Sequence, residues 1–451
     1  MYMYYQALTL LIVTVACNVH NLCSNGLPRI SSYSGETLHA CCTKEKVPSV
    51  TISSCSGGLG RPPSLHGTGP WSFFPCDIIR EPVYFFDFHQ VISYALVIKP
   101  LLLKTDMENT PQNDRAFCLD ALERVSRTFS LNIGVLRGDS HWGILLAYLL
   151  CRIADTIEDA PSVPASIKKQ KLCEYASLFP PGDDINTRVS LFLEDVDFAD
   201  DSDEGILLAN TGRVFSEFAS LPPPFIEKIS PHVREMACGM ADFQDRAANG
   251  GIAILRDRKE LERYCYYVAG TVGLMLTDVF LLENPHVSEK AAKNLYDRSV
   301  AFGLGLQLTN IAKDFAFDKE RGWCYVPLSF FREEGIDPAT DTYTAHPEGF
   351  LRVHRRLITL AASYLDEALQ YTLDIPRRSL RYRLFCLWPL FMALRSLTRI
   401  SASPDLFRGK SIKISRNEVK RIIQATSLAA PFNGILRLLY ARERNRLHKT
   451  W

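Results

Sequence analysis

Helical periodicity constrains the fold of this chain more than any other feature. From about residue 114 to residue 440, apolar residues recur at the three- and four-residue intervals of an amphipathic helix. Alternating apolar and polar runs, which would predict strands, do not separate these segments. Prolines fall between the segments or at their edges, as at 180–181 and 222–224, where a missing N–H costs little. The sequence therefore predicts an all-α fold with a single large helical domain.

The expected helices follow from the periodic segments and from the turn residues between them. We expect helices at about 114–130, 139–160, 165–177, 186–195, 203–220, 224–248, 257–282, 287–318, 349–373, 378–401 and 415–440. On this basis residues 106–441 are assigned to the helical domain, and residues 442–451 to a short polar tail.

Residues 1–105 differ in character and are expected to form an irregular N-terminal extension. Residues 24–80 are rich in Ser, Gly and Pro and show no sustained period. An apolar run at 7–17 has the length of a signal-peptide core but follows no Lys or Arg, so a targeting role stays open. A second apolar stretch, 84–103, is interrupted by charged residues, which favours a docked or interfacial helix over a membrane span.

Charge and cysteine usage exclude several classes of function. The chain has 51 Lys and Arg against 50 Asp and Glu, so it lacks the positive field that nucleic-acid binding requires. Apolar residues make up 47% of the sequence, enough for a substantial core. The 13 cysteines include no CxxC pair, and those after residue 100 lie in apolar contexts. They indicate buried, reduced thiols rather than a zinc site. We expect an intracellular protein.

A polar stripe marks the helix expected at 139–160. Tyr148, Arg152, Asp155 and Asp159 follow one another at steps of four, three and four, which places them on one helical face. Glu158 adds a third carboxylate beside them. Because burying unpaired charge costs several kcal/mol, roughly, such a stripe on an apolar helix must line a wet cavity or be paired.

A second stripe repeats this arrangement on the helix expected at 287–318. It consists of Gln307, Asn310, Asp314 and Asp318, at steps of three, four and four. Carboxylates brought to about 4 Å repel by roughly 4 kcal/mol per pair at an effective dielectric constant of about 20, so facing stripes require a cation between them.

The chemistry of the two stripes predicts the identity of this cation. A set of oxygen ligands without His or Cys selects a hard ion such as Mg²⁺, which Mn²⁺ can replace. The predicted ligands are Asp155, Glu158, Asp159, Asp314 and Asp318. Mg²⁺ often shares its shell with substrate phosphates, so a diphosphate is the expected substrate group. Its outer oxygens would be held by Arg127, Arg152, Lys313 and Arg321.

Five sequence blocks resemble the squalene/phytoene synthase family of head-to-head prenyl transferases, most of all its squalene synthases. They are Ser126-Arg127-Thr128-Phe129, residues 148–159, Tyr264-Cys265-Tyr266-Tyr267-Val268-Ala269-Gly270, Asn310-Ile311-Ala312-Lys313-Asp314 and Arg321-Gly322-Trp323-Cys324-Tyr325-Val326-Pro327. The blocks follow the family's order across residues 113–440. The resemblance implies an isoprenoid-synthase fold, in which helices surround a central cavity and the two aspartate motifs lie on opposite walls.

The resemblance also implies an activity. Squalene synthases join two farnesyl diphosphates with Mg²⁺ into presqualene diphosphate and then reduce this intermediate with NADPH. The matching residues assign a catalytic role to Tyr267, and to Asp155, Asp159, Asp314 and Asp318. The implied substrate-binding residues are Arg127, Thr128, Tyr148, Arg152, Gln307, Asn310, Lys313 and Arg321. The implied dinucleotide-binding residues are Arg127, Arg152, Lys313, Lys413 and Arg416.

Three positions depart from the family pattern. Phe317 stands where the second motif often has an acid, Lys313 stands where many relatives have arginine, and Ser415 stands at an expected basic position near Lys413. Two alternatives to a squalene synthase stay open. One is a sister enzyme that makes phytoene, dehydrosqualene or hydroxysqualene without the reduction, and the other is a noncatalytic assembly factor. Because prenyl diphosphates are lipids, we also expect contact with a membrane surface; the sequence favours a monomer.

Overall fold

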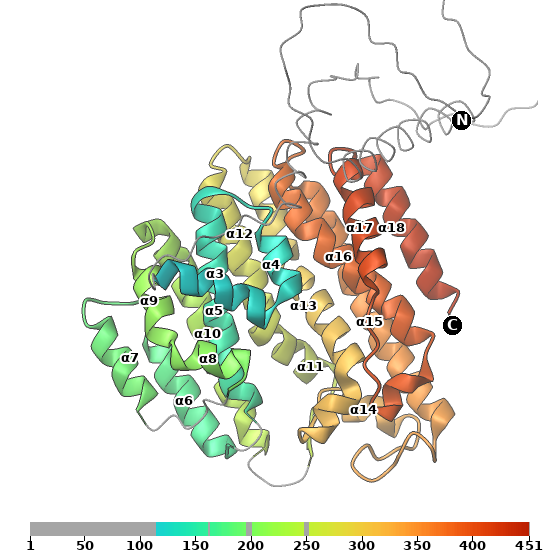
Figure 1. The fold of residues 1–451 in the computed structure, drawn as a ribbon. Coiled ribbons are helices and arrows are strands. Elements are labelled where there is room, and N and C mark those ends of the chain that lie inside the picture. Colours follow the sequence, from blue (N-terminus) through green and yellow to red (C-terminus); the bar gives the residue numbers. More distant parts are fainter. Residues whose placement is uncertain (1–113, 161–162, 195–200, 248–251, 451) are drawn as a thin grey trace, which may run out of the picture. The chain divides into compact units, whose positions relative to one another are not determined.

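The computed structural model describes residues 114–160, 163–194, 201–247 and 252–450, and it is helical almost throughout (Figure 1). The all-α prediction is confirmed. The extension at 1–105, with both of its apolar runs, lies outside the described residues. The elements are α3 (Asp114–Val125), α4 (Arg127–Ile133), α5 (Gly138–Asp159), α6 (Ala165–Ser177), α7 (Ile185–Leu193), α8 (Asp203–Ala209), α9 (Thr211–Ala219), α10 (Pro223–Ala247), β1 (Ala253–Ile254), α11 (Arg258–Cys265), the π-helical turn η1 (Tyr266–Gly270), α12 (Thr271–Glu283), α13 (Glu289–Glu320), β2 (Trp323–Cys324), α14 (Leu328–Arg332), α15 (Pro347–Asp374), α16 (Leu380–Ser401), the 3₁₀ turn η2 (Pro404–Arg408), α17 (Arg416–Ala429) and α18 (Asn433–His448).

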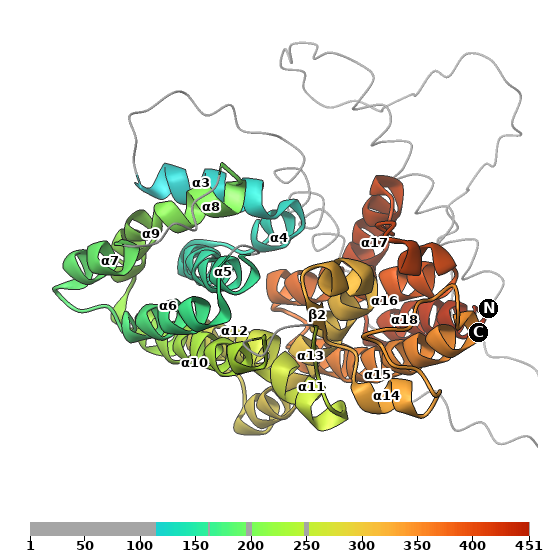
Figure 2. The same cartoon turned by 90° about the horizontal axis from the view of Figure 1, so that it is seen from below.

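Two long helices, α5 and α13, organise the helical domain. The helices α3, α8, α9, α6 and α10 surround α5 (Figure 2). This agrees with its sequence, since nearly every residue from Trp142 to Ala154 is buried and a helix that is apolar all round belongs in a core. The helix α13 packs along α15 and also contacts α12, α16 and η1. The two acidic stripes therefore belong to two separate groups of helices.

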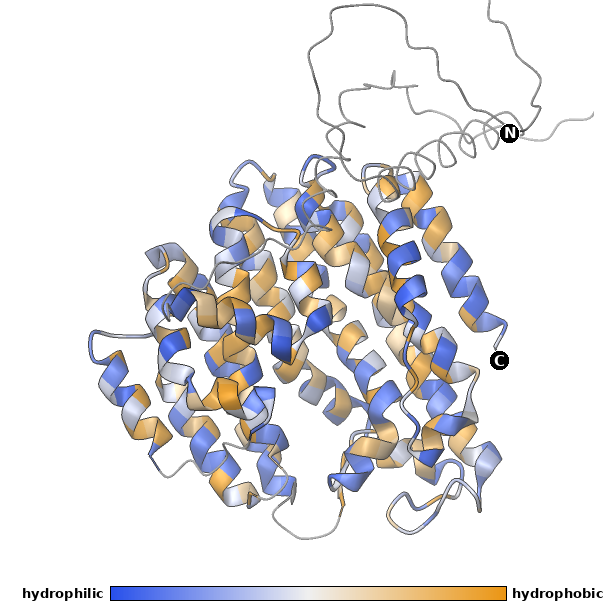
Figure 3. Ribbon diagram, in the orientation of Figure 1, coloured by the Kyte–Doolittle hydropathy of each residue, from blue (hydrophilic) through white to orange (hydrophobic). Residues whose placement is uncertain are grey.

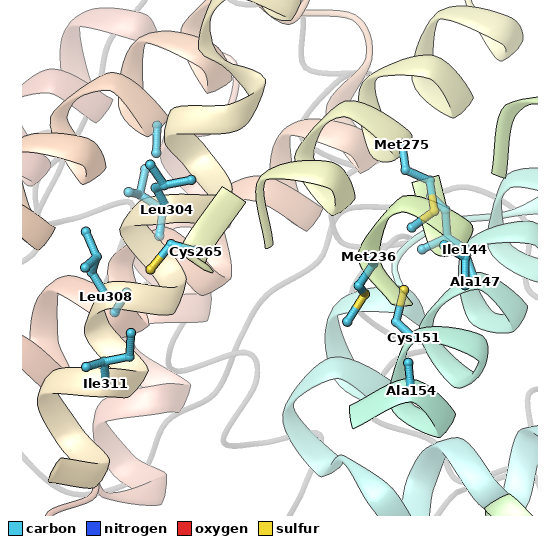
Figure 4. Packing of buried hydrophobic residues seen from close by; sticks show 14 of the residues in the cluster. Ile144, Ala147, Cys151, Ala154, Met236, Cys265, Met275, Leu304, Leu308 and Ile311 are labelled. Atoms are coloured by element: carbon cyan, nitrogen blue, oxygen red, sulfur yellow. The ribbon is translucent and has the colours of Figure 1, made fainter. Parts of the chain in front are cut away.

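Apolar side chains join the helices on both sides. In Figure 4, Ile144 and Cys151 of α5 lie near Met236 of α10 and Met275 of α12. On the other side, Cys265 of α11 lies near Leu304 and Leu308 of α13. Hydropathy colouring shows apolar residues where helices pack together and hydrophilic ones at the outer faces (Figure 3). The cysteines Cys151 and Cys265 are free, buried thiols, as their apolar contexts predicted. For Cys173 and Cys238 the prediction of burial is wrong, because both lie on exposed helix faces.

Three expected helices are broken in the structure, each near a residue that suits a helix end. Ser126 caps α4 by accepting a hydrogen bond from the Phe129 N–H at 3.2 Å, which separates α4 from α3. Asn210 separates α8 from α9. Residues 430–432, which include Pro431, separate α17 from α18. The helix α18 then continues to His448 and buries Leu447, so the polar residues 442–448 are helical.

The segment Arg258–Glu283 is the one described helix that is long and apolar enough to cross a membrane by length and composition alone. Here it packs inside the domain, as α11, η1 and α12. Glycines allow this close packing, because a Cβ on Gly273 would collide with the Ser299 carbonyl and one on Gly303 with the Ala269 carbonyl. Helix packing therefore accounts for these two glycines, and 39% of the apolar stretch of the segment is buried.

Candidate active site

A cavity of about 270 Å³ lies between the two groups of helices. Its polar character increases along both long helices toward their C-terminal ends. On α5 the lining residues progress from Ile144 to Arg152 and Asp155, and on α13 they progress from Phe302 to Asn310. Of the predicted site residues, those that line this cavity are Tyr148, Arg152, Asp155, Gln307 and Asn310. The structure thus combines an apolar interior with a charged mouth.

The three carboxylates near the end of α5 lie close to one another but differ in burial: Glu158 is buried, Asp155 is partly buried and Asp159 is exposed. Arg152 pairs with Asp155 at 3.7 Å between Nη1 and Oδ2 and donates from Nη2 to Glu204 Oε1 of α8 at 2.7 Å. Partial burial, with Asp159 nearby, raises the pKa of Asp155 to about 7 against the opposing effect of Arg152. Glu158 is 5% exposed, and burial with the neighbouring Asp159 and Asp155 raises its pKa well above the usual range. Its Oε1 has no hydrogen-bond partner among the described residues.

Arg321, which follows α13 directly, joins the two acidic motifs. Its Nη1 lies 2.8 Å from Asp159 Oδ1 of α5, and its Nη2 lies 2.7 Å from Asp318 Oδ1 of α13. Burial raises the pKa of Asp318 to about 6, although Arg321 lowers it. On the same helix, Lys313 Nζ lies 3.1 Å from Asp314 Oδ2. The two stripes therefore converge, and a guanidinium group already lies between them.

These residues fit a divalent cation by their chemistry. The part of the chain that the structure describes holds no preformed cluster of three or more metal-ligating side chains. The five predicted ligands nevertheless outnumber the four basic side chains that contact these residues, Arg152, Lys168, Lys313 and Arg321. Burial is the main reason that the pKa values of Asp155, Glu158 and Asp318 are raised, and a bound cation would favour their charged forms. An all-oxygen donor set of this kind suits Mg²⁺ or Mn²⁺, which a diphosphate would help to coordinate. The ligand assignment stays a prediction.

Besides Tyr267 and the residues at the acidic motifs, four predicted residues lie outside the cavity lining. Arg127 and Thr128 are exposed in the first turn of α4, next to Phe129, which does line the cavity. Lys413 and Arg416 are exposed near the start of α17. There Ser415 caps α17 and forms a reciprocal capping box with Glu418, so a helix start explains the missing basic residue.

Tyr267 also lies behind the cavity lining. It belongs to η1, where its neighbours Val268 and Ala269 line the cavity. Its ring lies against Gly239 of α10, where any side chain would collide with it. It also lies beside Phe243, with ring centroids 6.4 Å apart. In this arrangement Tyr267 supports the cavity wall, and the structure gives it no contact with the acidic motifs.

Two residues of the site escaped the sequence analysis. Glu204 anchors Arg152, but the two are 52 residues apart and no spacing links them. Asn132, at the end of α4, is 1% exposed and lines the cavity, and neither atom of its amide group has a hydrogen-bond partner. A single Asn in a helix carries no recognisable signal by itself. Buried amides are usually paired, so Asn132 is a marked exception within an apolar wall.

Comparisons with known proteins agree with this arrangement. The sequence profile of the family "Squalene/phytoene synthase" matches residues 122–418. Squalene synthase 1 of Arabidopsis thaliana is 26% identical over 343 residues, which cover 75% of this chain and 78% of the relative. Squalene synthase of Mus musculus is 26% identical over 332 residues, covering 69% and 70%. A solved structure of TcSQS with a ligand shares the fold, with a TM-score of 0.61 at 23% identity, and covers 75% of this chain and 96% of that one.

The helices, the cavity and the facing acidic motifs define an all-α isoprenoid synthase. The chain belongs to the squalene/phytoene synthase family, whose members are prenyltransferases that condense isoprenoid diphosphates head to head. The resemblance predicted from the five blocks is confirmed.

Proposed function

We propose that this protein is a squalene synthase, which joins two farnesyl diphosphates through presqualene diphosphate and reduces the product with NADPH. One observation carries the proposal: an apolar cavity opens at Arg152 and Asp155, next to two acidic motifs that converge on Arg321. The names of the related proteins support the choice of squalene as the product.

The first step requires stabilisation of a departing diphosphate. Arg152, Lys313 and Arg321 already lie beside the carboxylates and can bind its oxygens as negative charge develops. A Mg²⁺ ion held by the acidic motifs would supply Lewis-acid stabilisation of the same charge. Because Arg152 is fixed by Glu204, its guanidinium needs little reorganisation when the substrate binds.

The carbocation that remains requires shelter from water. Beyond Arg152 and Asp155 the cavity is lined by side chains such as Phe302, Leu306 and Met275, which exclude water from a prenyl chain. The ring of Phe129 lies 5.0 Å from that of Tyr148, and both line the cavity. Their π faces can stabilise a nearby cation. We place the reacting carbon atoms between this aromatic pair and the acidic mouth.

NADPH would bind through basic side chains. Lys413 and Arg416 follow η2, and η2 packs against α13 through Phe407 and Phe315, whose ring centroids are 5.7 Å apart. This position brings the basic segment to the helix that carries the second acidic motif. Arg127, Arg152 and Lys313 complete the proposed contacts.

One observation favours a second candidate, a sister enzyme that omits the reduction. Ser415 is committed to capping α17, so the basic segment offers one cation fewer than the squalene synthase pattern. Phe317 is 40% exposed and also offers no oxygen ligand in the second motif. Such an enzyme would release phytoene, dehydrosqualene or hydroxysqualene.

One assay separates these candidates. Purified protein is incubated with farnesyl diphosphate and Mg²⁺, with and without NADPH, and the extracted lipids are identified by mass spectrometry. We expect squalene with NADPH and presqualene diphosphate without it. A product that is indifferent to NADPH would favour the sister enzyme. If neither farnesyl nor geranylgeranyl diphosphate were converted, the noncatalytic role would be correct.

A further inference from the structure

The last two helices carry an unusual concentration of positive charge. Residues 413–449 contain nine Lys or Arg residues and two Glu residues, a net charge of +7 in a chain whose total is +1. The α17–α18 hairpin, which we define as Arg416–His448, contains most of this excess. The rest of the chain is therefore acidic on balance, and the molecule is electrically polarised toward its C-terminal hairpin.

Both acidic residues of the hairpin are turned inward. Glu418 is 8% exposed and contacts Arg395 and Arg399 of α16. The side chain of Glu443 is 14% exposed and lies 2.5 Å from Arg395. No carboxylate of residues 413–449, all of which the structure describes, is therefore available to neutralise the cations on the outer faces of these helices.

Several of those cations are unpaired. Lys420, Arg421 and Arg442 are exposed, and none forms an ion pair or a hydrogen bond with a described residue. Lys420 and Arg421 are exposed on α17, and Leu428 follows about two helical turns further on. A solvated helix usually mixes charges of both signs, so this single-sign group requires a different explanation.

Exposed leucines accompany these cations. Leu438 is 72% exposed on α18, the largest value among the exposed large apolar residues that the structure describes, and Leu428 is 48% exposed at the end of α17. Figure 3 shows the start of α18 as apolar and its later turns as hydrophilic. Exposed leucines on the same helices as unpaired cations match the two layers of a membrane interface, where acyl chains lie beneath anionic headgroups.

We propose that the α17–α18 hairpin binds the surface of an anionic bilayer. Leu428 and Leu438 enter the boundary between headgroups and acyl chains, while Lys420, Arg421 and Arg442 contact lipid phosphates and carboxylates. The charge complementarity identifies the partner. A nucleic acid would explain the cations but not the leucines, and an apolar protein groove would explain the leucines but not the cations. The proposal does not depend on which reaction the cavity catalyses.

Vesicle co-sedimentation of the full chain tests the proposal, using phosphatidylcholine vesicles with and without phosphatidylserine. We expect binding to the anionic vesicles, weakened by added salt, and at least about tenfold weaker binding to neutral ones. K420E/R421E should lose about tenfold in binding to anionic vesicles. L428S/L438S should bind anionic vesicles several-fold more weakly, and its remaining binding should be more sensitive to salt.

Matched variants elsewhere on the surface serve as controls. K259E/K290E makes the same change of charge on exposed lysines of α11 and α13, and Leu191→Ser removes a leucine that is 57% exposed on α7. Both should bind vesicles like the parent, and all variants should keep the parent's melting temperature. Equal losses in the control variants would overturn the assignment to the hairpin. Unchanged binding in L428S/L438S would also overturn it and indicate a general polyanion surface, as would equal binding to neutral and anionic vesicles.

Discussion

The helices α5 and α13 carry acidic motifs of the same spacing, yet the structure holds the two motifs differently. The basic residue of α5, Arg152, is fixed from a third helix by Glu204 as well as by Asp155. The basic residue of α13, Lys313, reaches only its own helix, at Asp314 and Asn310. The two motifs therefore have the same spacing, but their basic residues are held by different contacts. The side of α5 is preorganised, and the side of α13 is left adjustable.

Arg321 compensates for part of this difference. It belongs to the chain of α13 but binds Asp159 of α5 as closely as it binds Asp318. The two motifs therefore share one guanidinium, and a change at Arg321 affects both of them. A diphosphate with its metal ions would compete for the same carboxylates.

Removing one carboxylate from each helix should have the largest effect. Under the proposed function, Asp155→Asn and Asp314→Asn should each slow diphosphate release on the order of 10³-fold, because charge stabilisation at a reacting centre is commonly worth this much. Single-turnover release of diphosphate measures the loss. The glutamate variants of the same positions serve as controls that retain charge. An Asp314→Asn variant with most of the parent's rate would mean that α5 alone carries the chemistry.

Arg321→Gln should separate the two motifs. We expect turnover to fall on the order of 10²-fold, since a charge-assisted contact with the leaving group is lost. Without the guanidinium, however, the carboxylates should bind Mg²⁺ more tightly in the absence of substrate. Titration of Mg²⁺ followed by thermal unfolding measures this affinity. Weaker Mg²⁺ binding together with slower turnover would show that Arg321 organises the metal site and does not compete with it.

Exchanging arginine and lysine at positions 152 and 313 tests whether the α5 side is held more firmly than the α13 side. Arg152→Lys breaks a two-sided contact and should lower kcat/KM by about tenfold, because lysine cannot reproduce the forked geometry of a guanidinium. Lys313→Arg substitutes a longer side chain at a position that contacts only its own helix. It should change kcat/KM by no more than about threefold. Steady-state kinetics with farnesyl diphosphate measures both values. Equal effects of the two exchanges would contradict the difference in fixation.

The pH dependence of stability should follow the raised pKa values of Asp155 and Asp318. The folded-state pKa values of Asp155 and Asp318, about 7 and about 6, exceed the ordinary value of 3.8, so the folded chain binds more protons than the unfolded chain between about pH 4 and pH 7. Their contribution to the free energy of unfolding is therefore present at low pH and is lost as the pH rises through this interval.

The measurement compares the melting temperatures of the parent and D155N/D318N in metal-free buffer. Because the two proteins share all other titratable groups, their difference cancels the contribution of those groups. Relative to that variant, the parent's melting temperature should fall between pH 5 and pH 8, and Mg²⁺ should restore more of it at pH 8 than at pH 5. If the difference between the two proteins were constant with pH, the carboxylates would be compensated within the protein already.

The smallest predicted effect concerns the apolar side of the cavity. Asn132 has a buried and unpaired amide, so Asn132→Leu should raise the free energy of unfolding by about 1 kcal/mol. Denaturant unfolding measures the gain, and Asn132→Asp should lower stability as a control for charge. If leucine lowered stability, the amide would have a partner in solution, such as a bound water.

The sequence predicted most of the helical domain because its signals are local. Periodicity and caps identified the helices, and the three breaks occur at residues whose effects are also local, such as Ser126. Helical spacing placed Asp155 and Asp314 each on a polar helical face, and the five blocks identified the family, whose resemblance implied that the two faces oppose each other. The pairing of these residues could not be predicted, because it depends on distant neighbours. No residue near Arg152 in the sequence predicts its contact with Glu204. None near Asn132 predicts that its amide lacks a hydrogen-bond partner in the cavity wall.

The short β1–β2 ladder has a consequence for Arg321. Ala253 N–H donates to the Gly322 carbonyl at 2.8 Å, and Leu255 N–H donates to the Cys324 carbonyl at 3.2 Å. These bonds tie down the chain directly after Arg321, while the end of α13 fixes it from the other side. The backbone part of the conformational entropy of placing this cation is therefore lost when the protein folds, before a substrate arrives. A single residue inserted between Gly322 and Trp323 would shift the register of the ladder. The segment after Arg321 would then have to become ordered each time a substrate binds.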